Sequence, residues 1–346
     1  MTEMITLPHA AESRDQLARP ASVVVGHALR LKPGEKLVVL CDAPSRPIAY
    51  AIVDAARACS VDAILADLDD LGARPHKIVP DAWSFALALA QASVFVASAP
   101  KEELPMRQHL LHLVAAHRLR HAHMPGITEQ LFVRGVRLGD ERSLERAKRV
   151  RERLSTGHRL EATSALGTRL SIDLTGVRWF SQLGVLEPGR WGNLPAGALY
   201  SSPPEAGVEG ELIVNASLGE WFGRREGVLE QKPVRMLVRA GRVVEVRAPH
   251  SRQLERDIEA LLAVSPSSAR IGLACVGVNE ALEGPFGDPL VDQNLPGLHL
   301  GVGDPAARIT GARWSSPTSF AACQFGASVA VDGVPVIAAG RMVVGD

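Results

Sequence analysis

Residues 314–340 read WSSPTSFAACQFGASVAVDGVPVIAAG, and this stretch decides the fold of the carboxyl-terminal half. Its apolar runs are short, and Asp332-Gly333 stands between two of them as a turn. This pattern predicts strands joined by tight turns. Similar runs, separated by glycine and proline turns, occur upstream at 168–176, 210–219 and 234–249. The second half of the chain is therefore expected to be mostly β.

One helix is expected to interrupt these strands. The segment 251–264 reads SRQLERDIEALLAV, with Ser251 as a plausible N-cap and acidic residues in the first turns. A serine side chain at this position can accept a hydrogen bond from a free backbone N–H group of the first turn. We expect the helix to begin directly after Ser251.

The first part of the chain alternates between helical and strand patterns. Residues 14–31 carry apolar residues at helical intervals, with a break expected near Pro20. Apolar runs follow at 37–41 and 94–97, and between them residues 47–68 read as a helix and then a strand. This alternation is typical of a parallel α/β sheet. The sequence thus predicts a doubly wound α/β domain at the amino terminus.

A highly charged segment separates the two patterns. Residues 139–158 read GDERSLERAKRVRERLSTGH, with acids early and bases late, as in a solvated helix aligned with its own dipole. We place the domain junction here, with an N-terminal α/β domain at 1–150 and a β-rich α+β domain at 151–346. A chain of 346 residues is long enough for two cores.

The bulk composition restricts the partners and the compartment. Basic and acidic residues balance at 38 each, so net charge does not favour nucleic acid or an anionic membrane. The four cysteines are far apart, which argues against a zinc site or a disulfide framework. The sequence has neither a signal peptide pattern nor an apolar run of about 20 residues. We expect a cytoplasmic protein whose ligand is a small molecule or a peptide.

A family resemblance starts from EPGRWGNLPAGALYSSPPEAGVEGELIV at 187–214. This segment resembles the superfamily of the M29 metal-dependent aminopeptidases and the 2,5-dihydroxypyridine dioxygenases. Pro188-Gly189-Arg190-Trp191 matches the dioxygenases and Leu194-Pro195-Ala196-Gly197 matches the aminopeptidases. The later pieces RIGLACVGVNEAL, GLHLGVGD and VAVDGVPVIAAG follow in the expected order. The resemblance implies the fold of this superfamily over nearly the whole chain.

The resemblance also identifies the positions at which relatives bind a metal ion. Most of them carry side chains here that cannot bind one. These positions are Ala198 and Leu273 in the aminopeptidase pattern, Arg270 in the dioxygenase pattern, and Ser319 and Ala321, where both families have His-x-Asp. His299 alone matches a ligand position, and the dioxygenase acid/base positions correspond to Ser181 and Asn193. About three ligands are needed for such a centre, so we expect no metal and no cofactor.

Several residues have two interpretations. His299 either has a structural role or contacts a ligand. Arg270 is either a surface residue or a receptor for a carboxylate. The side chain of Trp191 lies either in the core or in the ligand cleft, as one of four tryptophans after residue 150. His121 and His123 are either a metal-binding pair or, as further ligands are not evident, a polar strand end.

These observations favour a non-catalytic member of the fold over an enzyme. The resemblance extends to metal-free, peptide-binding accessory proteins of crocagin-type ribosomal-peptide pathways. It implies binding of a leader or core peptide, cooperation with biosynthetic enzymes and a homo-oligomer such as a dimer. The alternative is a working aminopeptidase or ring-cleaving dioxygenase with relocated ligands, for example His299 with Asp292, Asp304 and Glu280. A purely structural subunit is a third possibility.

Overall fold

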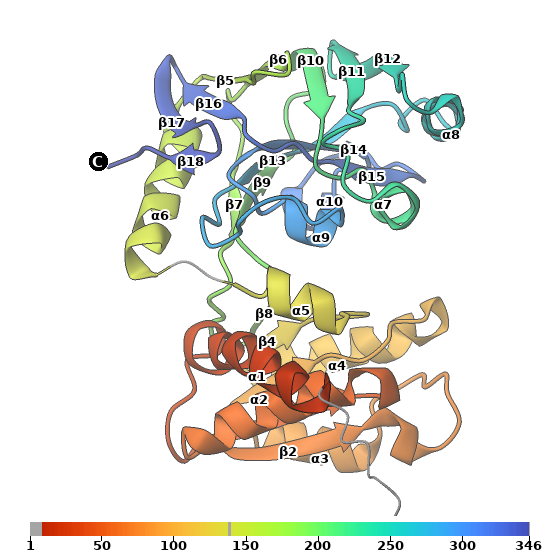
Figure 1. Cartoon of the computed structure of the whole chain (residues 1–346). Coiled ribbons are helices and arrows are strands. Elements are labelled where there is room, and N and C mark those ends of the chain that lie inside the picture. The colour runs from red at the N-terminus through yellow and green to blue at the C-terminus, as the bar shows by residue number, and fades with distance from the viewer. Residues whose placement is uncertain (1–8, 138–139, 346) are drawn as a thin grey trace, which may run out of the picture. The chain divides into compact units, whose positions relative to one another are not determined.

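The chain forms two compact units in the computed structural model, which describes residues 9–137 and 140–345. Within these ranges the first unit comprises 9–137 and 184–196, and the second comprises 140–183 and 197–345. Both units are mixed assemblies of helices and strands (Figure 1). The expected fold class, a doubly wound α/β domain followed by a β-rich domain, is confirmed.

The division of the chain differs from the expected boundary after residue 150 in two respects. That boundary falls inside α6 (Glu141–Thr156), whose Val150 and Leu154 are buried in the core of the second unit. The segment 184–196 returns to the first unit, where β8 (Arg190–Asn193) pairs with β4 (Arg120–His123). Trp191 and Asn193 therefore belong to the first unit and not to the β-rich one.

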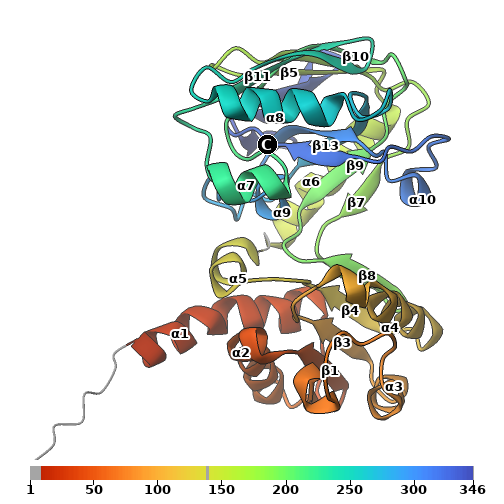
Figure 2. The same cartoon turned by 90° about the vertical axis from the view of Figure 1, so that its right-hand side faces the viewer.

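The first unit is built on a five-stranded parallel sheet in the order β2-β1-β3-β4-β8. Helices cover both of its faces, as the two views show (Figure 2). α3 and α4 pack against Val38, Leu40 and Phe95 on one face. The remaining elements of this unit are β1 (Lys36–Cys41), β2 (Asp62–Asp67), β3 (Ala92–Phe95), α1 (His9–Ser22), α2 (Arg46–Ala58), α3 (Asp81–Ala88), α4 (Leu104–Ala116), α5 (Glu129–Gly135) and the short turns η2 (Ala43–Ser45), η3 (Leu68–Leu71) and η4 (Lys101–Glu103).

Pro20 does not break the first helix as expected. It lies inside α1, and three residues later the backbone widens into the π-helical turn η1 (Val23–Ala28). The N–H of Leu29 accordingly reaches back five residues to the carbonyl of Val24, at 2.9 Å. A proline removes one helical hydrogen bond and crowds the preceding turn, and a local change of helix type is one way to accommodate this.

The second unit contains two antiparallel sheets that share one core. An eight-stranded sheet has the order β12-β11-β10-β6-β5-β16-β17-β18, and a five-stranded sheet has the order β15-β14-β13-β9-β7. Both contribute buried side chains to one apolar cluster, which α6 and α8 (Arg252–Leu262) also join. Ser251 caps α8 as expected, because its side chain accepts a hydrogen bond from the N–H of Leu254. The other elements are β5 (Arg159–Thr163), β6 (Arg169–Asp173), β7 (Phe180–Gln182), β9 (Ala198–Ser201), β10 (Val208–Val214), β11 (Val234–Arg239), β12 (Arg242–Arg247), β13 (Ile271–Gly277), β14 (Gly297–Gly303), β15 (Ser319–Ala322), β16 (Ser328–Val331), β17 (Val334–Ala338), β18 (Arg341–Met342), α7 (Glu220–Glu226), α9 (Pro289–Asp292) and α10 (Ala307–Thr310).

Within the described ranges, no helix combines the length and the apolar character that a membrane crossing requires.

Candidate functional site

The five-stranded sheet of the second unit brings most of the predicted positions onto one face. Side chains alternate between faces along a strand, and Leu298, Leu300 and Val302 of β14 point into the core. His299 and its cross-strand neighbours therefore lie on the opposite face. The predicted positions on this face are Ala198 on β9, Leu273 on β13, His299 on β14, and Ser319 and Ala321 on β15. We call this face the ligand frame.

Two glycines of β14 leave room in the middle of the ligand frame. Gly301 pairs with Leu273 on one side and with Ala321 on the other, and Gly303 pairs with Ser319. Leu273 occupies part of this room, since a Cβ atom on Gly301 would lie 2.9 Å from the Cβ of Leu273. At this point an apolar side chain packs where the aminopeptidase pattern has a carboxylate.

His299 is a structural histidine. Its Nε2 lies 2.9 Å from the carbonyl oxygen of Leu295, and its Nδ1 accepts a hydrogen bond from the N–H of Gln324 at 3.2 Å. Both ring nitrogens are thus engaged by the backbone, and Nε2 carries the proton. Burial lowers the pKa of His299 to about 4, so the ring is neutral at physiological pH. A metal ion would have to break one of these hydrogen bonds to bind it.

Arg270 lies at the end of the ligand frame and already has partners. Its guanidinium carbon is 3.9 Å from the ring centroid of Trp314, a cation–π contact. Its Nη2 atom is 3.2 Å from a carboxylate oxygen of Glu205, whose side chain is 78% exposed. An exposed ion pair of this kind is weak, so a carboxylate ligand could compete with Glu205 for this arginine.

The acidic residues that the enzyme alternative requires have structural roles. Asp292 accepts hydrogen bonds from the N–H groups of Phe286 and Gly287, and burial raises its pKa to about 6. Glu280 is paired with Arg146, and Asp304 accepts a hydrogen bond from the N–H of Ala306. None of these carboxylates is a hydrogen-bond partner of His299.

The residues of the ligand frame do not fit an iron or zinc ion. Ala198, Leu273 and Ala321 have no donor atom, and the donor atoms of His299 are occupied. Across 9–137 and 140–345, no three His, Cys, Asp or Glu side chains gather as a metal site would need. No step of chemistry through a metal is therefore derived for this chain.

A second group of polar residues extends along β3 and β4 of the parallel sheet in the first unit and ends at His123, the last residue of β4. The hydroxyl of Ser93 is 2.8 Å from Nδ1 of His121, and Nε2 of His121 is 3.1 Å from Nδ1 of His123. All three residues are buried, and the register places their side chains on one face of the sheet. The two histidines are thus within hydrogen-bond distance of each other, and among the described residues no third His, Cys, Asp or Glu joins them as a metal site would need.

The hydrogen-bond directions in this group follow from the need to satisfy the Ser93 hydroxyl. It is fully buried, and its partner among the described residues is His121, so its proton is donated to Nδ1 of that ring. His121 then donates from Nε2 to Nδ1 of His123, which leaves the proton of His123 on Nε2. Burial lowers the pKa of both histidines, that of His123 to about 4, and the nearby positive charge of Arg107 lowers the latter further. The group ends in a neutral N–H donor.

Trp191 and Asn193 border this donor. β8 places Trp191 opposite His121 and Asn193 opposite His123 in the parallel register. The indole of Trp191 is 44% exposed and meets the ring of His123 edge to face, with centroids 5.8 Å apart. The other dioxygenase acid/base position, Ser181, lies in the second unit, whereas Asn193 lies in the first.

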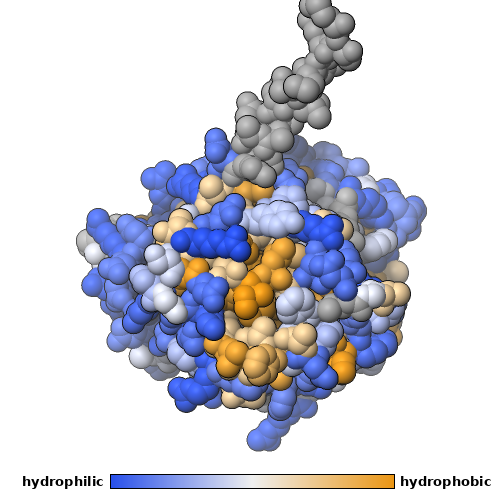
Figure 3. Space-filling model, turned by 90° about the horizontal axis from the view of Figure 1, so that it is seen from below, coloured by the Kyte–Doolittle hydropathy of each residue, from blue (hydrophilic) through white to orange (hydrophobic). Residues whose placement is uncertain are grey.

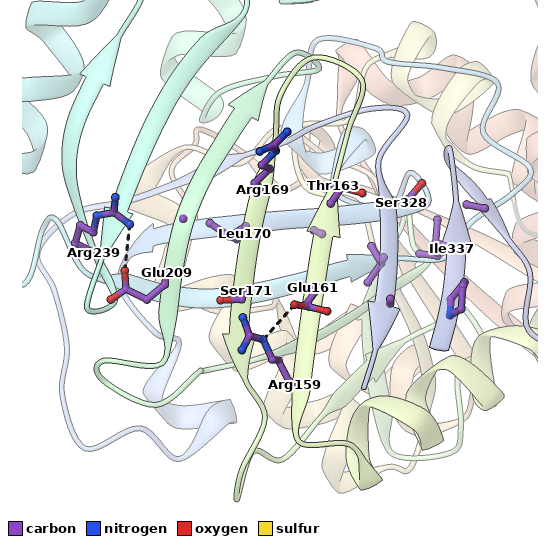
Figure 4. Close-up of a pocket in the computed structure, with 16 residues that line it drawn as sticks. Arg159, Glu161, Thr163, Arg169, Leu170, Ser171, Glu209, Arg239, Ser328 and Ile337 are labelled. Carbon is purple, nitrogen blue, oxygen red and sulfur yellow. Dashed lines mark ion pairs between the residues drawn. The ribbon is translucent and has the colours of Figure 1, made fainter. Parts of the chain in front are cut away.

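The second unit also has a groove on the outer face of its large sheet (Figure 4). Its volume is about 690 Å³, and its lining includes Thr163, Ser171 and Ser328, whose side chains are small. Two ion pairs also line the groove. Nε of Arg159 lies 3.3 Å from Oε1 of Glu161, and Nη1 of Arg239 lies 3.6 Å from Oε2 of Glu209. Arg169 also lines the groove and is drawn without an ion pair. Neither this groove nor Arg107 was singled out in the sequence, because both depend on tertiary structure.

Comparisons with known proteins agree on the fold. The family model of 2,5-dihydroxypyridine 5,6-dioxygenase (NicX) matches residues 26–254. The structure of 2,5-dihydroxypyridine dioxygenase from Pseudomonas putida KT2440 is similar with a TM-score of 0.67 and 16% identity, covering 96% of this chain and 98% of that one. Wild-type AmpT from Thermus thermophilus is similar with a TM-score of 0.58 and 18% identity, covering 96% and 100%. No curated protein sequence matches this chain.

Proposed function

This chain belongs to the 2,5-dihydroxypyridine 5,6-dioxygenase family, and we propose that it is a non-catalytic, metal-free member that binds a peptide and presents it to partner enzymes. The observation that carries the proposal is the chemistry of the ligand frame. The strands that would present metal ligands are formed and in register, whereas the positions themselves hold alanine, leucine, serine and an occupied histidine. The scaffold remains and its metal chemistry does not.

A peptide fits the described surfaces better than a compact small molecule does. The groove of Figure 4 crosses several strands of an open sheet face and offers hydroxyl groups, charged pairs and an additional cation, Arg169. An extended chain can use such a surface along its length, with side chains meeting alternate charges. Arg270, stacked on Trp314, is a second group able to receive an acidic side chain or a carboxyl terminus. We propose the leader or core of a ribosomally made natural-product precursor as the peptide.

Presentation to partner enzymes requires a docking surface. The first unit exposes several large apolar side chains, including Ile78 at 60%, Phe85 at 68% and Leu89 at 51%. The space-filling view likewise shows apolar residues grouped between hydrophilic ones (Figure 3). Exposed apolar groups of this size are typical of surfaces that bind another protein. They support a proposed role with biosynthetic enzymes or with a second copy of the chain.

Metal loading tests the non-catalytic part of the proposal. Purified full-length protein would be incubated with iron(II), zinc or manganese, desalted and measured by inductively coupled plasma mass spectrometry. We expect less than about a tenth of an equivalent of each metal, because the frame has too few donors. Close to one equivalent, together with oxygen consumption in the presence of 2,5-dihydroxypyridine, would establish the enzyme alternative instead.

Titration calorimetry tests the peptide part separately. Candidate precursor peptides would be titrated into the full chain, with scrambled peptides of the same composition as controls. We expect saturable binding of an authentic peptide and weaker binding to an Arg169→Glu variant, which reverses the additional charge of the groove. The absence of heat with every precursor peptide would contradict peptide binding while leaving the metal result intact.

A further inference from the structure

We propose that the first unit has a separate binding site for an aromatic carboxylate, formed by Arg107, His123 and Trp191. This site goes beyond the proposed function, because it lies on the parallel sheet and involves neither the ligand frame nor the groove. The ligand carries both a carboxylate and a flat ring. It could belong to a small aromatic acid or to the carboxyl-terminal phenylalanine or tyrosine of a peptide.

Arg107 has a side chain without a polar partner among the described residues. Arg107 lies on the second turn of α4, and its Nε atom is buried and without a hydrogen-bond partner. Among the residues that the structure describes, no ion pair or hydrogen bond to its side chain is found. Glu103, one turn earlier, cannot neutralise it, because this carboxylate is bound to Arg74 and to the N–H of His76. The side chain is half-buried, so its Nε leaves one donor unsatisfied, and a bound carboxylate would satisfy it.

His123 provides a hydrogen-bond donor for the same ligand. His123 is only 6% exposed, its Nδ1 is used by His121, and its Nε2–H has no partner among the described residues. α4 packs on the sheet face that carries Phe95, whose ring stacks on His123 with centroids 5.3 Å apart, and the charge of Arg107 lowers the pKa of His123. A carboxylate placed between them would accept from the imidazole with one oxygen and from the guanidinium with the other.

Trp191 provides a surface for the flat ring of the ligand. The exposed indole of Trp191 adjoins His123 and provides a flat apolar surface for a ring. His123 is the last residue of β4, at the carboxyl end of the strand, where α/β sheets generally bind their ligands. The amino end of α4 is on the same edge, and its dipole favours a negative charge. These features select an aromatic acid over a neutral or cationic ligand.

Calorimetry with matched acids and amides tests the site. Benzoate and N-acetylphenylalanine would be titrated into the full-length protein, with benzamide and N-acetylphenylalaninamide as neutral counterparts. We expect saturable binding of at least one acid and none of its amide. Binding of benzoate alone would identify a small aromatic acid as the ligand, whereas binding of N-acetylphenylalanine alone would identify a peptide terminus. An acid and an amide that bind equally, or no binding of either acid, would overturn the proposal.

Two substitutions distinguish a binding residue from a structural one. Arg107→Gln should weaken acid binding tenfold or more, since a hydrogen bond to a charged group is lost. The same variant should unfold at the same temperature as the wild type or higher, because an unpaired charge has been removed from a half-buried side chain. Arg118→Gln, which removes an exposed arginine just beyond the other end of α4, is the matched control and should leave binding unchanged.

The Arg107→Gln and His123→Phe variants distinguish a structural role from a binding role. A lower unfolding temperature for Arg107→Gln with unchanged acid binding would assign Arg107 a structural role and overturn the site. His123→Phe keeps the ring stacking and removes the donor, so it should also weaken the acid. Because the peptide groove lies in the other unit, loss of precursor binding and loss of acid binding are separately measurable.

Discussion

His299 and His123 stand in comparable positions, each buried on a strand, yet their surroundings differ. Both ring nitrogens of His299 are engaged by the backbone, and its neighbours on the ligand frame are apolar or small. The ring of His123 is engaged on one side only, and Arg107 beside it has no counter-charge. The same residue type therefore completes the fold in one region and leaves a donor free in the other.

This difference indicates where to look for function in a chain whose ligand frame holds mostly alanine, leucine and serine. Polar groups that are buried and satisfied stabilise the fold, whereas polar groups that are buried and unsatisfied carry a cost that only a ligand removes. By this criterion the donor atoms of His299 in the ligand frame are satisfied, whereas those of His123 and Arg107 mark the place of the proposed site. Three predictions test the contrast.

The largest effect is expected from restoring ligands to the frame. Arg270→His, Ser319→His and Ala321→Asp together would recreate the dioxygenase set next to the two glycines of β14. We expect bound iron(II) to rise from below a tenth to nearly one equivalent, since three protein ligands suffice for such a site. The measurement is mass spectrometry of anaerobically loaded protein.

The matched control is the double variant Ser319→His with Ala321→Asp. It retains the positive charge of Arg270 and should bind much less iron than the triple variant. A triple variant that is folded and yet binds no more iron than the wild type would contradict the placement of these positions around one site.

The sequence predicted the strands that carry the frame, because its motifs fall on separate strands of one sheet. Ser319 and Ala321 are two residues apart on β15, so a shared face follows from the alternation of a strand. The segment that returns to the first unit was not predictable in the same way. β8 reads Arg-Trp-Gly-Asn, which lacks the apolar alternation of a strand, and only its pairing with β4 reveals it.

The roles of the histidines were also beyond the sequence. The partners of His299 are a backbone carbonyl and a backbone N–H, and these groups exist at every position of a chain. The sequence gives no signal for Arg107, because the lack of a partner for its Nε among the described residues is seen only in the folded structure. The His-x-His pattern at the end of β4 was the one available signal for this region.

The next largest effect is expected from His299→Leu. This change leaves the carbonyl of Leu295 and the N–H of Gln324 without partners in a dry environment, which should lower the free energy of unfolding by roughly 3 kcal/mol. Chemical denaturation monitored by circular dichroism measures it. Binding of the aromatic acid should not change, because that site lies in the other unit.

A stability loss below about 0.5 kcal/mol would show that His299 is not a structural residue, since changes of this size are typical of exposed sites. Loss of acid binding in a folded His299→Leu protein would equally contradict the separation of the two regions.

The smallest effect is the difference in pH dependence between the wild type and the same variant. The pKa of His299 is about 4 in the folded protein, below its ordinary value of 6.5, so the unfolded chain binds more protons between these values. Lowering the pH through this window therefore destabilises the fold. Asp292 opposes the trend, because its pKa is raised to about 6 and the folded protein takes up its proton first.

Comparing two proteins that share Asp292, His121 and His123 cancels these contributions. From pH 7 to pH 5 the wild type should lose about 2 kcal/mol more unfolding free energy than His299→Leu, as follows from the two pKa values of this histidine. His117→Leu, which replaces an exposed histidine, should retain the wild-type slope. Equal slopes for the wild type and His299→Leu would mean that the ring of His299 is protonated in the folded protein, and its assignment as a neutral structural residue would then be wrong.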